Sequence, residues 1–248
     1  MSSDNQLLLA VINSTNDGNL WIALIINLFL LLFAYLLGSI PTGYWLGKIF
    51  FQVDIFQEGS KSMGATNVLR TLGKIPAISV LLIDVLKGVI PIILIKLLYQ
   101  LENTRLFLLP ENLANVSDVL PWLVTLAGLA SVFGHTKSIW IGWRGGKSVA
   151  TSLGVLLAMC WQVGLGAFAV FAVSLAISRI VSFSSILAAI AVSLLMFGFQ
   201  QPLPYLIFGI TAGIYVIWRH RANIQRILNG QEPRIGQKLA TETREESV

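Results

Sequence analysis

The run SVATSLGVLLAMCWQVGLGAFAVFAVSLAIS, residues 148–178, decides the fold. A helix crosses the hydrocarbon core of a membrane in about 20 apolar residues, so a run of about 30 is long for one crossing and short for two. Trp161 and Gln162 interrupt the run near its middle. A division at this point predicts two short membrane helices, and it fixes the number of crossings in the whole chain.

The rest of the chain has the composition of an integral membrane protein. Its 248 residues are 55% hydrophobic and 12% charged, with a mean hydropathy of +0.76, whereas about a quarter of a soluble domain is charged. The apolar runs fill most of the length, which predicts one membrane domain. Besides residues 148–178, the predicted spans are residues 21–47, 75–99, 119–134, 183–200 and 203–218.

The basic residues indicate which side of the membrane each loop occupies, because cytoplasmic loops are rich in Lys and Arg. Basic loops follow the first and third spans, and the cluster 219–226 follows the last, whereas the loop after the second span is acidic on balance. The first 20 residues carry no Lys or Arg. Seven crossings put the N-terminus outside and every basic segment in the cytoplasm, and six would not. The basic residues behind the net charge of +5 therefore act as orientation signals beside the spans, and they do not indicate nucleic-acid binding.

This count divides the chain into three parts. We expect an extracytoplasmic segment over residues 1–20 and a seven-helix membrane domain over residues 21–230. The segment from Gln231 to residue 248 is polar and mixed in charge, which predicts a disordered cytoplasmic tail.

Two polar, glycine-containing segments stand between the spans: residues 58–70 (EGSKSMGATNVLR) and residues 142–148 (GWRGGKS). Glycine lets backbone N–H groups approach a ligand, and Arg and Lys add positive charge, a combination that suits phosphate. The second segment is not a nucleotide P-loop, because that motif requires glycine where this chain has Ile141. From these residues alone, phosphate binding and the alternative that the glycines only permit close helix packing have equal support.

Charges are rare inside the predicted spans. Asp84 and Lys87 lie three residues apart in the second span, so they share adjoining helix surface. An internal ion pair is the simpler interpretation, although intramembrane charge is costly and often supports function. Lys96, later in the same span, is expected to be an interfacial residue. Pro41 is expected to bend the first span.

The remaining reactive side chains give little chemistry by themselves. His135 and His220 each follow an apolar span and could be plain interfacial residues. Neither begins the H-x-x-x-x-D pair of many acyltransferases that use acyl-CoA or acyl carrier protein. The single cysteine, Cys160, lies in an apolar run and is expected to be inert. The sequence shows no metal-ligand spacing of His, Cys or carboxylates, so we expect neither a metal nor a cofactor.

Taken together, the segments resemble the bacterial acyl-phosphate:glycerol-3-phosphate acyltransferases of the PlsY type. The resemblance runs in order from about residue 30 to 230 and rests on these segments: Gly38-Ser39-Ile40-Pro41, residues 59–70, Asp84 with Lys87-Gly88, Gly134-His135, residues 145–151 and residues 219–224. It implies an all-α, seven-helix protein of the bacterial inner membrane, with its active site facing the cytoplasm. It also implies transfer of an acyl chain from acyl phosphate to the 1-position of glycerol 3-phosphate, giving lysophosphatidic acid in a first step of phospholipid synthesis.

The resemblance assigns roles by motif match. Catalytic roles fall to Ser60, Arg70, Lys147 and His220, and supporting roles to Asp84, Lys87 and His135. Substrate contacts fall to these four catalytic residues and to Thr66, Asn67, Gly145, Gly146, Ser185 and Asn223. Lys61 and Ser148 depart from the family pattern, which commonly has glycine at both positions. Lys61 could alter the loop geometry or contact phosphate.

The reaction needs two phosphates held close together. Arg70 can grip one in a bidentate fork, Lys147 can act as a mobile point charge, and the backbone amides of Gly145 and Gly146 can form a nest for the other. Acyl phosphate is already activated, so positioning and charge can suffice. No serine has an evident adjacent base, which predicts that no acyl-enzyme forms. His220 or the substrate's own phosphate could take the proton of the attacking hydroxyl.

A transporter or channel for an organic phosphate is the alternative function, because short broken helices and a basic site would also serve it. The basic loops all lie on one face, and no inverted repeat is apparent, which argues against transport. The predicted partners are acyl phosphate, glycerol 3-phosphate and the lipid bilayer. A bundle of seven helices can stand alone as a monomer.

Overall fold

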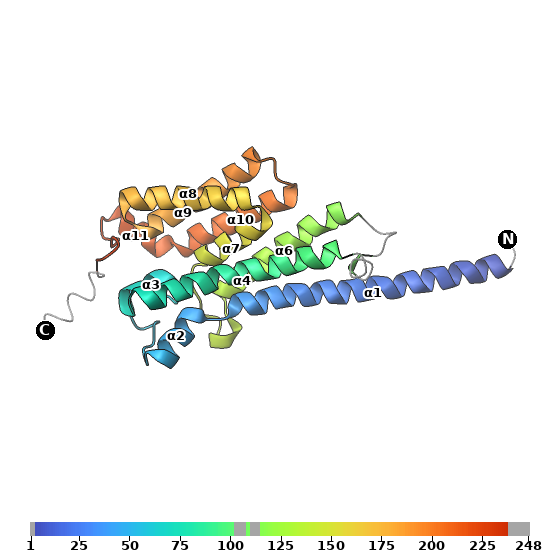
Figure 1. Ribbon diagram of the computed structural model, residues 1–248, viewed down its shortest axis with the longest axis horizontal. Helices are drawn as coiled ribbons and strands as arrows, with labels where there is room; N and C mark the ends of the chain where they lie inside the picture. The colour runs from blue at the N-terminus through green and yellow to red at the C-terminus, as the bar shows by residue number, and fades with distance from the viewer. Residues whose placement is uncertain (1–2, 102–107, 110–114, 238–248) are drawn as a thin grey trace.

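The computed structural model describes residues 3–101, 108–109 and 115–237, with side chains from Leu20 onward (Figure 1). The helices are α1 (Ser3–Ser39), α2 (Thr42–Phe50), α3 (Ala65–Thr71), α4 (Lys74–Gln100), α6 (Val116–Thr136), the 3₁₀ helix η1 (Ile139–Ile141), α7 (Val149–Met159), α8 (Trp161–Ser178), α9 (Val181–Gly198), α10 (Leu203–Arg219) and α11 (Arg221–Leu228). Within these ranges there is no strand, only an isolated bridge between Ser138 and Arg144. The predicted all-α class is confirmed.

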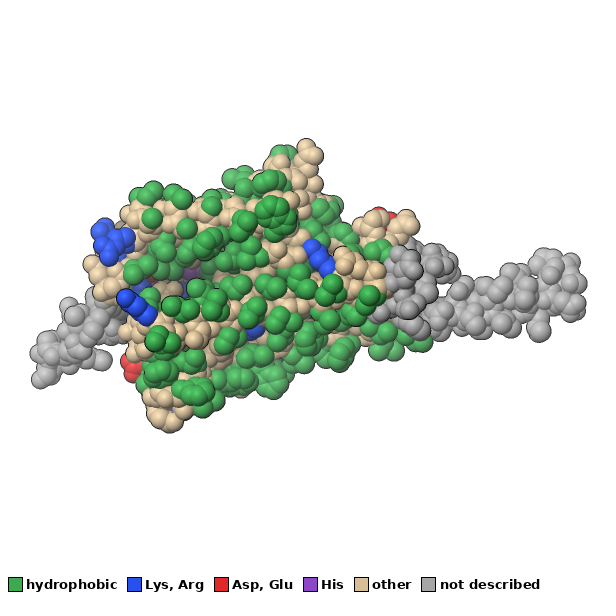
Figure 2. Space-filling model, viewed as in Figure 1, with side chains coloured by type: hydrophobic (Ala, Val, Ile, Leu, Met, Phe, Trp, Pro, Cys, Tyr) green, Lys and Arg blue, Asp and Glu red, His purple; other side chains and the backbone are tan. Residues whose placement is uncertain are grey.

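Five helical segments are long and apolar enough to cross a membrane: the Leu20–Ser39 part of α1, and α4, α6, α8 and α9. Two further apolar helices are shorter, α7 with 11 residues and α10 with 17. Large apolar side chains cover the outside, and Ile75 and Ile177 are each 81% exposed. Figure 2 shows hydrophobic side chains over most of the visible face. Such a surface faces lipid in an integral membrane protein.

The first predicted span is broken rather than bent. α1 ends at Ser39 and α2 begins at Thr42, on the two sides of Ile40 and Pro41. At the break the Ile40 carbonyl accepts the Thr42 N–H at 3.0 Å, and Lys87 Nζ of α4 donates to the same oxygen at 2.5 Å. Helix α1 also begins at Ser3, far before the expected start at residue 21. A proline is tolerated here because a side chain of another helix, Lys87 of α4, hydrogen-bonds to the backbone at the break.

The run 148–178 divides as predicted. Cys160 is extended, with φ −149° and ψ 97°, and it separates α7 from α8. Lys96 Nζ donates to the carbonyls of Ala158 and Met159, at 2.7 and 2.9 Å, at the end of α7. Lys96 thus has a capping role that its expected interfacial position does not include. It caps a helix that ends beside another helix, where water is not the partner.

Small residues bring α4 and α7 together over a long contact. A Cβ at Gly88 of α4 would collide with the Thr151 carbonyl, and one at Gly154 of α7 would collide with the Val85 carbonyl. Close approach of this kind replaces the hydrophobic effect as the source of helix association in lipid. The pair α4 and α7 forms one wall of the pocket described below.

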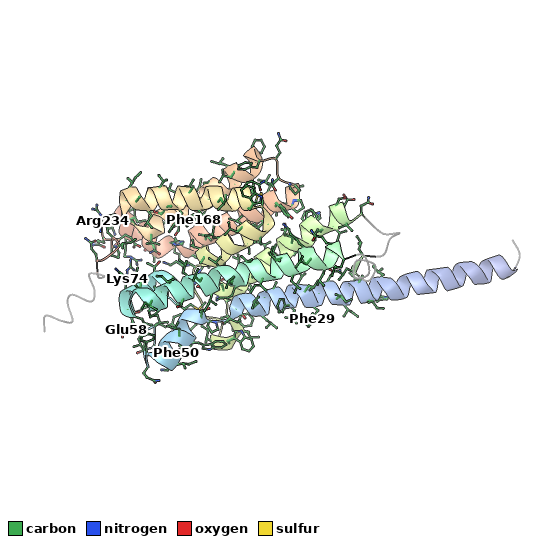
Figure 3. The ribbon with its side chains drawn as sticks, in the orientation of Figure 1. Phe29, Phe50, Glu58, Lys74, Phe168 and Arg234 are labelled. Carbon is green, nitrogen blue, oxygen red and sulfur yellow. The ribbon has the colours of Figure 1, made fainter. Side chains whose placement is uncertain are left out.

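The polar segments collect at one end of the molecule. α1 begins at the opposite end of the long axis, whereas α2, α3 and α11 gather together (Figure 1). Glu58, Lys74 and Arg234 all lie at this second end, and Phe29 lies far from it along α1 (Figure 3).

Candidate active site

A pocket of about 380 Å³ reaches from the polar end of the molecule into the helix bundle. Its polar part is lined by residues that are distant in sequence: Ser60, Thr66, Asn67, Arg70, Lys147, Ser148, Ser182, Ser185, His220, Asn223 and Glu232. Its apolar part lies between α4, α7, α8 and α9 and is lined by Leu81, Leu82, Val85, Leu153, Leu156, Ala167, Phe168, Phe171, Ala188, Ala189 and Val192. Leu82 and Phe168 are also 57% and 49% exposed, so the apolar walls reach the lipid-facing surface (Figure 3).

Lys147 stands directly before α7 at the polar end of this pocket. Its Nζ donates to Asn223 Oδ1 at 2.6 Å. Burial lowers the pKa of Lys147 to about 8, opposed by the nearby Glu232 carboxylate and assisted by nearby arginines, Arg70 among them. The ammonium is therefore charged at neutral pH but poorly solvated, a state that a bound anion would relieve.

Glu232 connects three segments beneath Lys147. Its Oε1 accepts from Asn223 Nδ2 at 2.6 Å and from Ser182 Oγ at 2.7 Å, and its Oε2 accepts from Arg226 Nε at 2.6 Å. Burial alone would raise the pKa of Glu232, but the hydrogen bonds from Asn223, Ser182 and Arg226 outweigh burial and hold the pKa below its usual value. The carboxylate thus fixes the amide that receives Lys147.

The position of Glu232 corrects the predicted tail. The segment from Gln231 was expected to be disordered, yet Glu232 is 9% exposed and belongs to the site. Residues 238–248 lie outside the described part of the chain. A single carboxylate beyond the last apolar span gives no periodic signal, and only its nearness in sequence to Arg226 and Asn223 hinted at a role.

His220 links α10 to α11 and is 3% exposed. Its Nδ1 lies 2.8 Å from the Val216 carbonyl, a contact in which a protonated Nδ1 donates. Burial and the charge on Lys147 lower the pKa of His220 to about 4, although the contact with Val216 and the Glu232 carboxylate oppose them. The ring is therefore neutral near pH 7, and with the proton on Nδ1 its Nε2 is free to accept a proton.

Asn67 organises the loop before α3. Its Nδ2 donates to the carbonyls of Ile55, Glu58 and Ser62 at 2.9–3.0 Å, and its Oδ1 accepts the Ser60 N–H at 2.7 Å. With its polar atoms used in this way, Asn67 holds the loop in shape. It presents Ser60 to the pocket, and the direct substrate contact expected of Asn67 is not its main role.

Gly145 and Gly146 let two segments touch. The Gly146 N–H donates to the His135 carbonyl at 3.1 Å, and Arg219 Nη2 donates to the carbonyls of Gly145 and Gly146 at 3.3 and 3.0 Å. A Cβ at Gly146 would fall on the His135 ring. The predicted amide nest is therefore wrong for Gly146, whose donor is already used. The alternative of close packing describes this pair.

Asp84 and Lys87 form an ion pair of 2.6 Å between side chains that are each 2% exposed. His135 Nδ1 lies 3.9 Å from the same Asp84 oxygen. Asp84 and His135 line the pocket, whereas Lys87 lies outside its lining and turns to the Ile40 carbonyl. The pair predicted from the i, i+3 spacing is confirmed, and it joins α4 to the break after α1.

The pocket thus gathers most of the predicted residues. It brings together Ser60, Thr66, Arg70, Lys147, Ser185, His220 and Asn223 from five separated segments. Gly145, Gly146 and Lys87 do not line it. Ser182 and Glu232 line it and escaped the sequence interpretation.

Comparison with known proteins follows the same lines. A family model described as glycerol-3-phosphate acyltransferase matches residues 28–230. The chain is 57% identical over 219 residues to a glycerol-3-phosphate acyltransferase of Trichodesmium erythraeum, covering 88% of this chain and 96% of that one. It is 61% identical over 210 residues to a protein of the same description from Trichormus variabilis, covering 85% of this chain and 92% of that one.

Two solved structures are similar over nearly their whole length. Both are described as crystal structures of PlsY (YgiH), an integral membrane glycerol 3-phosphate acyltransferase, one in its glycerol 3-phosphate form and one in its lysophosphatidic acid form. The first has a TM-score of 0.74 at 39% identity, over 85% of this chain and 96% of that chain. The second has a TM-score of 0.71 at 39% identity, over 85% of this chain and 95% of that chain.

Proposed function

The chain belongs to the glycerol-3-phosphate acyltransferase family, and we propose that it takes its acyl chain from acyl phosphate. The protein is an integral membrane enzyme that acylates glycerol 3-phosphate to lysophosphatidic acid for phospholipid synthesis. This assignment excludes the alternative of a phosphate transporter. The 39% identity to PlsY and the absence of an H-x-x-x-x-D pair at either histidine support the proposed donor.

The shape of the pocket carries the proposal. Cations, hydroxyls and the paired carboxylates of Asp84 and Glu232 occupy its polar end, and apolar side chains of four helices line the rest. Acyl phosphate has the same division, with a phosphate at one end and a long alkyl chain at the other. The alkyl chain fits between α4, α7, α8 and α9, and its phosphate meets the charged end, where glycerol 3-phosphate also binds.

Arg70 and Lys147 are the proposed phosphate ligands. Arg70 stands in the last turn of α3 and is near enough to Lys147 to lower its pKa. A planar guanidinium can hold two phosphate oxygens at once, and the ammonium adds a compact charge. The hydroxyls of Ser60, Thr66 and Ser185 line the same space and can donate to phosphate or glycerol oxygens.

The proposed reaction is a direct transfer. The 1-hydroxyl oxygen of glycerol 3-phosphate attacks the acyl carbonyl carbon, and a C–O ester bond forms. The bond from that carbon to the phosphate oxygen breaks, and phosphate leaves with the electron pair. The hydroxyl proton passes to His220 Nε2 or to a substrate phosphate. Lys147 and Arg70 stabilise the charge that develops on the leaving phosphate.

Other predicted residues position the substrate-binding groups in this proposal and do not contact the substrate themselves. Asn223 holds Lys147 through its 2.6 Å hydrogen bond, and Asn67 shapes the Ser60 loop. The backbone carbonyl of His135 accepts the Gly146 N–H at 3.1 Å and so holds the Gly145–Gly146 turn in place. Rigid support of this kind keeps the contacting groups in the geometry that the reaction requires.

We expect only acyl phosphate to serve as the donor. Purified enzyme in detergent, given labelled glycerol 3-phosphate, should form lysophosphatidic acid with palmitoyl phosphate and none with palmitoyl-CoA or palmitoyl acyl carrier protein. With palmitoyl phosphate alone, the intact protein should gain no acyl mass, because no serine has a base beside it. Product formed from palmitoyl-CoA would refute the donor, and a stoichiometric acyl adduct that decays on adding glycerol 3-phosphate would refute direct transfer.

The proposed topology has seven crossings, with α7 and α10 added to the five long spans, the N-terminus outside and the site in the cytoplasm. We propose that a monomer suffices, because seven membrane helices can form a self-contained bundle. The positive-inside rule is the argument for orientation. Ser117, Lys74, Arg179 and Arg221 are exposed and suit a labelling test.

In intact cells carrying a Cys160→Ala background, an impermeant maleimide should label Ser117→Cys. It should not label Lys74→Cys, Arg179→Cys or Arg221→Cys until the cells are opened. Ser185 is 3% exposed and so unsuited to this test. Labelling of Arg179→Cys from outside would show that residues 148–178 do not cross twice.

A further inference from the structure

A second pocket lies on the other side of the Gly145–Gly146 turn. It has a volume of about 250 Å³ and is lined by Phe56, Lys61, Thr136, Lys137, Trp143, Arg144, Gly145 and Arg219. Four of these side chains are cationic, and no carboxylate is among the lining residues of the described chain. Lys61, Trp143 and Arg144 are exposed, so the pocket opens to the surface.

Four segments contribute to both pockets, with neighbouring residues divided between them. In each segment one residue lines the active-site pocket and a near neighbour lines the second pocket. The residues of the active-site pocket are Ser60, His135, Lys147 and His220, and their neighbours in the second pocket are Lys61, Thr136, Arg144 and Arg219, in the same order. The two pockets therefore share their walls. A charge bound in one changes the field in the other at short range.

Arg219 is the direct link between the pockets. Its Nη2 donates to the carbonyls of Gly145 and Gly146, at 3.3 and 3.0 Å, in the turn that precedes Lys147. Its Nε is buried and has no hydrogen-bond partner in the part of the chain that the structure describes. A buried guanidinium donor without a partner is unfavourable, and an anion in the second pocket would compensate the charge of this guanidinium.

Two lining residues hold an unusual backbone conformation. Lys61 has φ 53° and Trp143 has φ 61°, in the left-handed region that side chains other than glycine seldom adopt. Arg144 packs its guanidinium 4.0 Å above the Phe56 ring, which keeps this cation at the rim. Backbone strain of this type concentrates where side chains serve a ligand.

We propose that this pocket is a second anion site, which binds a phosphate group beside the active site. Four cations without a carboxylate require a multiply charged anion, and arginine forks match phosphate oxygens. The group has two sources at the proposed cytoplasmic membrane surface, a soluble phosphate or the headgroup of an anionic phospholipid. Trp143 and Phe56 beside the cations fit a site at that interface.

In the test, mutations distinguish the two pockets. The choice between detergent with inorganic phosphate and nanodiscs with phosphatidic acid distinguishes the two sources of the phosphate group. Lys147→Ala removes the central cation of the active-site pocket, and Lys61→Gly with Arg144→Gln removes two cations of the second. Lys48→Gln with Lys74→Gln removes two exposed cations that line neither pocket and serves as the charge-matched control. Thermal unfolding is followed with inorganic phosphate in maltoside detergent, and in phosphate-free nanodiscs of phosphatidylcholine with or without phosphatidic acid.

In the Lys147→Ala background, ligand at about ten times its Kd should raise Tm by about 3–5 °C. Adding Lys61→Gly and Arg144→Gln should remove the rise, and adding the control pair should not. A rise with inorganic phosphate identifies a soluble ligand, and a rise only with phosphatidic acid identifies a lipid. No rise from either source, or a rise that survives the Lys61 and Arg144 exchanges, overturns the second site. This binding test does not depend on the acyl donor, so it can fail while the proposed function stands.

Discussion

Replacement of Lys147 by methionine should lower kcat/KM for glycerol 3-phosphate about ten- to more than a hundred-fold without destabilising the protein. Loss of a charge-assisted hydrogen bond to phosphate costs about 1.5–3 kcal/mol, which corresponds to this range of rates. Burial lowers the pKa of Lys147 from 10.5 to about 8, so the buried charge costs the fold about 3 kcal/mol. Methionine removes that cost and leaves one acceptor on Asn223 unpaired.

The same pKa predicts a pH dependence in which activity and stability move in opposite directions. In the free enzyme, kcat/KM should fall as the pH rises through about 8, because Lys147 then loses its proton. Above that pH the unfolded chain still holds this proton up to about 10.5, so Lys147 makes the fold more stable as the pH rises. The Lys147→Arg variant should show no alkaline fall near pH 8.

Rate profiles of purified enzyme between pH 6 and 10, with Tm measured in the same buffers, would check both statements. Lys48→Met, an exposed charge outside the pocket, is the matched control and should keep the wild-type profile. A wild-type rate in Lys147→Met would remove Lys147 from the phosphate site. An alkaline fall that persists in Lys147→Arg would assign that fall to another group.

The Lys87→Met variant should unfold more easily by about 3–5 kcal/mol, the usual cost of leaving one member of a buried ion pair alone. Asp84 and Lys87 are each 2% exposed, and their 2.6 Å contact lies inside the helix bundle. The double variant Asp84→Asn with Lys87→Met should recover most of the loss, because no unpaired charge remains. It should not recover all of it, since the Ile40 carbonyl would keep the Thr42 N–H but lose the ammonium of Lys87 as a second donor.

Unfolding in mixtures of maltoside and dodecyl sulfate would measure these differences. Lys96→Met is the internal comparison, because it also removes a lysine that donates to backbone carbonyls but leaves no carboxylate behind. If the unfolding free energy of Lys87→Met fell by less than about 1 kcal/mol, or if the double variant were no more stable than Lys87→Met, the Asp84–Lys87 ion pair would not stabilise the fold.

The helices and the divided run could be predicted because each depends on a local property. Apolar length indicates the spans, and the balance of basic loops predicts a division near Trp161, which the structure has at Cys160. The end of α7 also gives Lys96 a role that the sequence does not reveal. From the sequence, a lysine late in an apolar run is an interfacial residue, and only the packed structure shows two open carbonyls beside it.

The site was predictable where motifs name the side chain and unpredictable where geometry decides. Lys147, His220 and Asn223 could be assigned by motif, and they line one pocket. The role of Gly146 could not, because glycine permits both an open nest and a close packing contact. The choice depends on the His135 carbonyl opposite, which accepts the Gly146 N–H. For Glu232 the only local signal was its nearness in sequence to Arg226 and Asn223.

The lysines of α4 also bear on how this protein is made. Sixteen Leu, Ile and Val residues in Lys74–Gln100 favour insertion of the helix by about 0.3–0.6 kcal/mol each, while Asp84 and Lys87 oppose it by about 2.5–3.5 kcal/mol each, so the two nearly balance. The Ile40 carbonyl, which receives Lys87, has already been synthesised when α4 leaves the ribosome. The carbonyls that receive Lys96 belong to α7 and come later. We therefore expect the segment after α1 to assist the insertion of α4, and the Lys96 end of α4 to be stabilised only after α7 has been inserted.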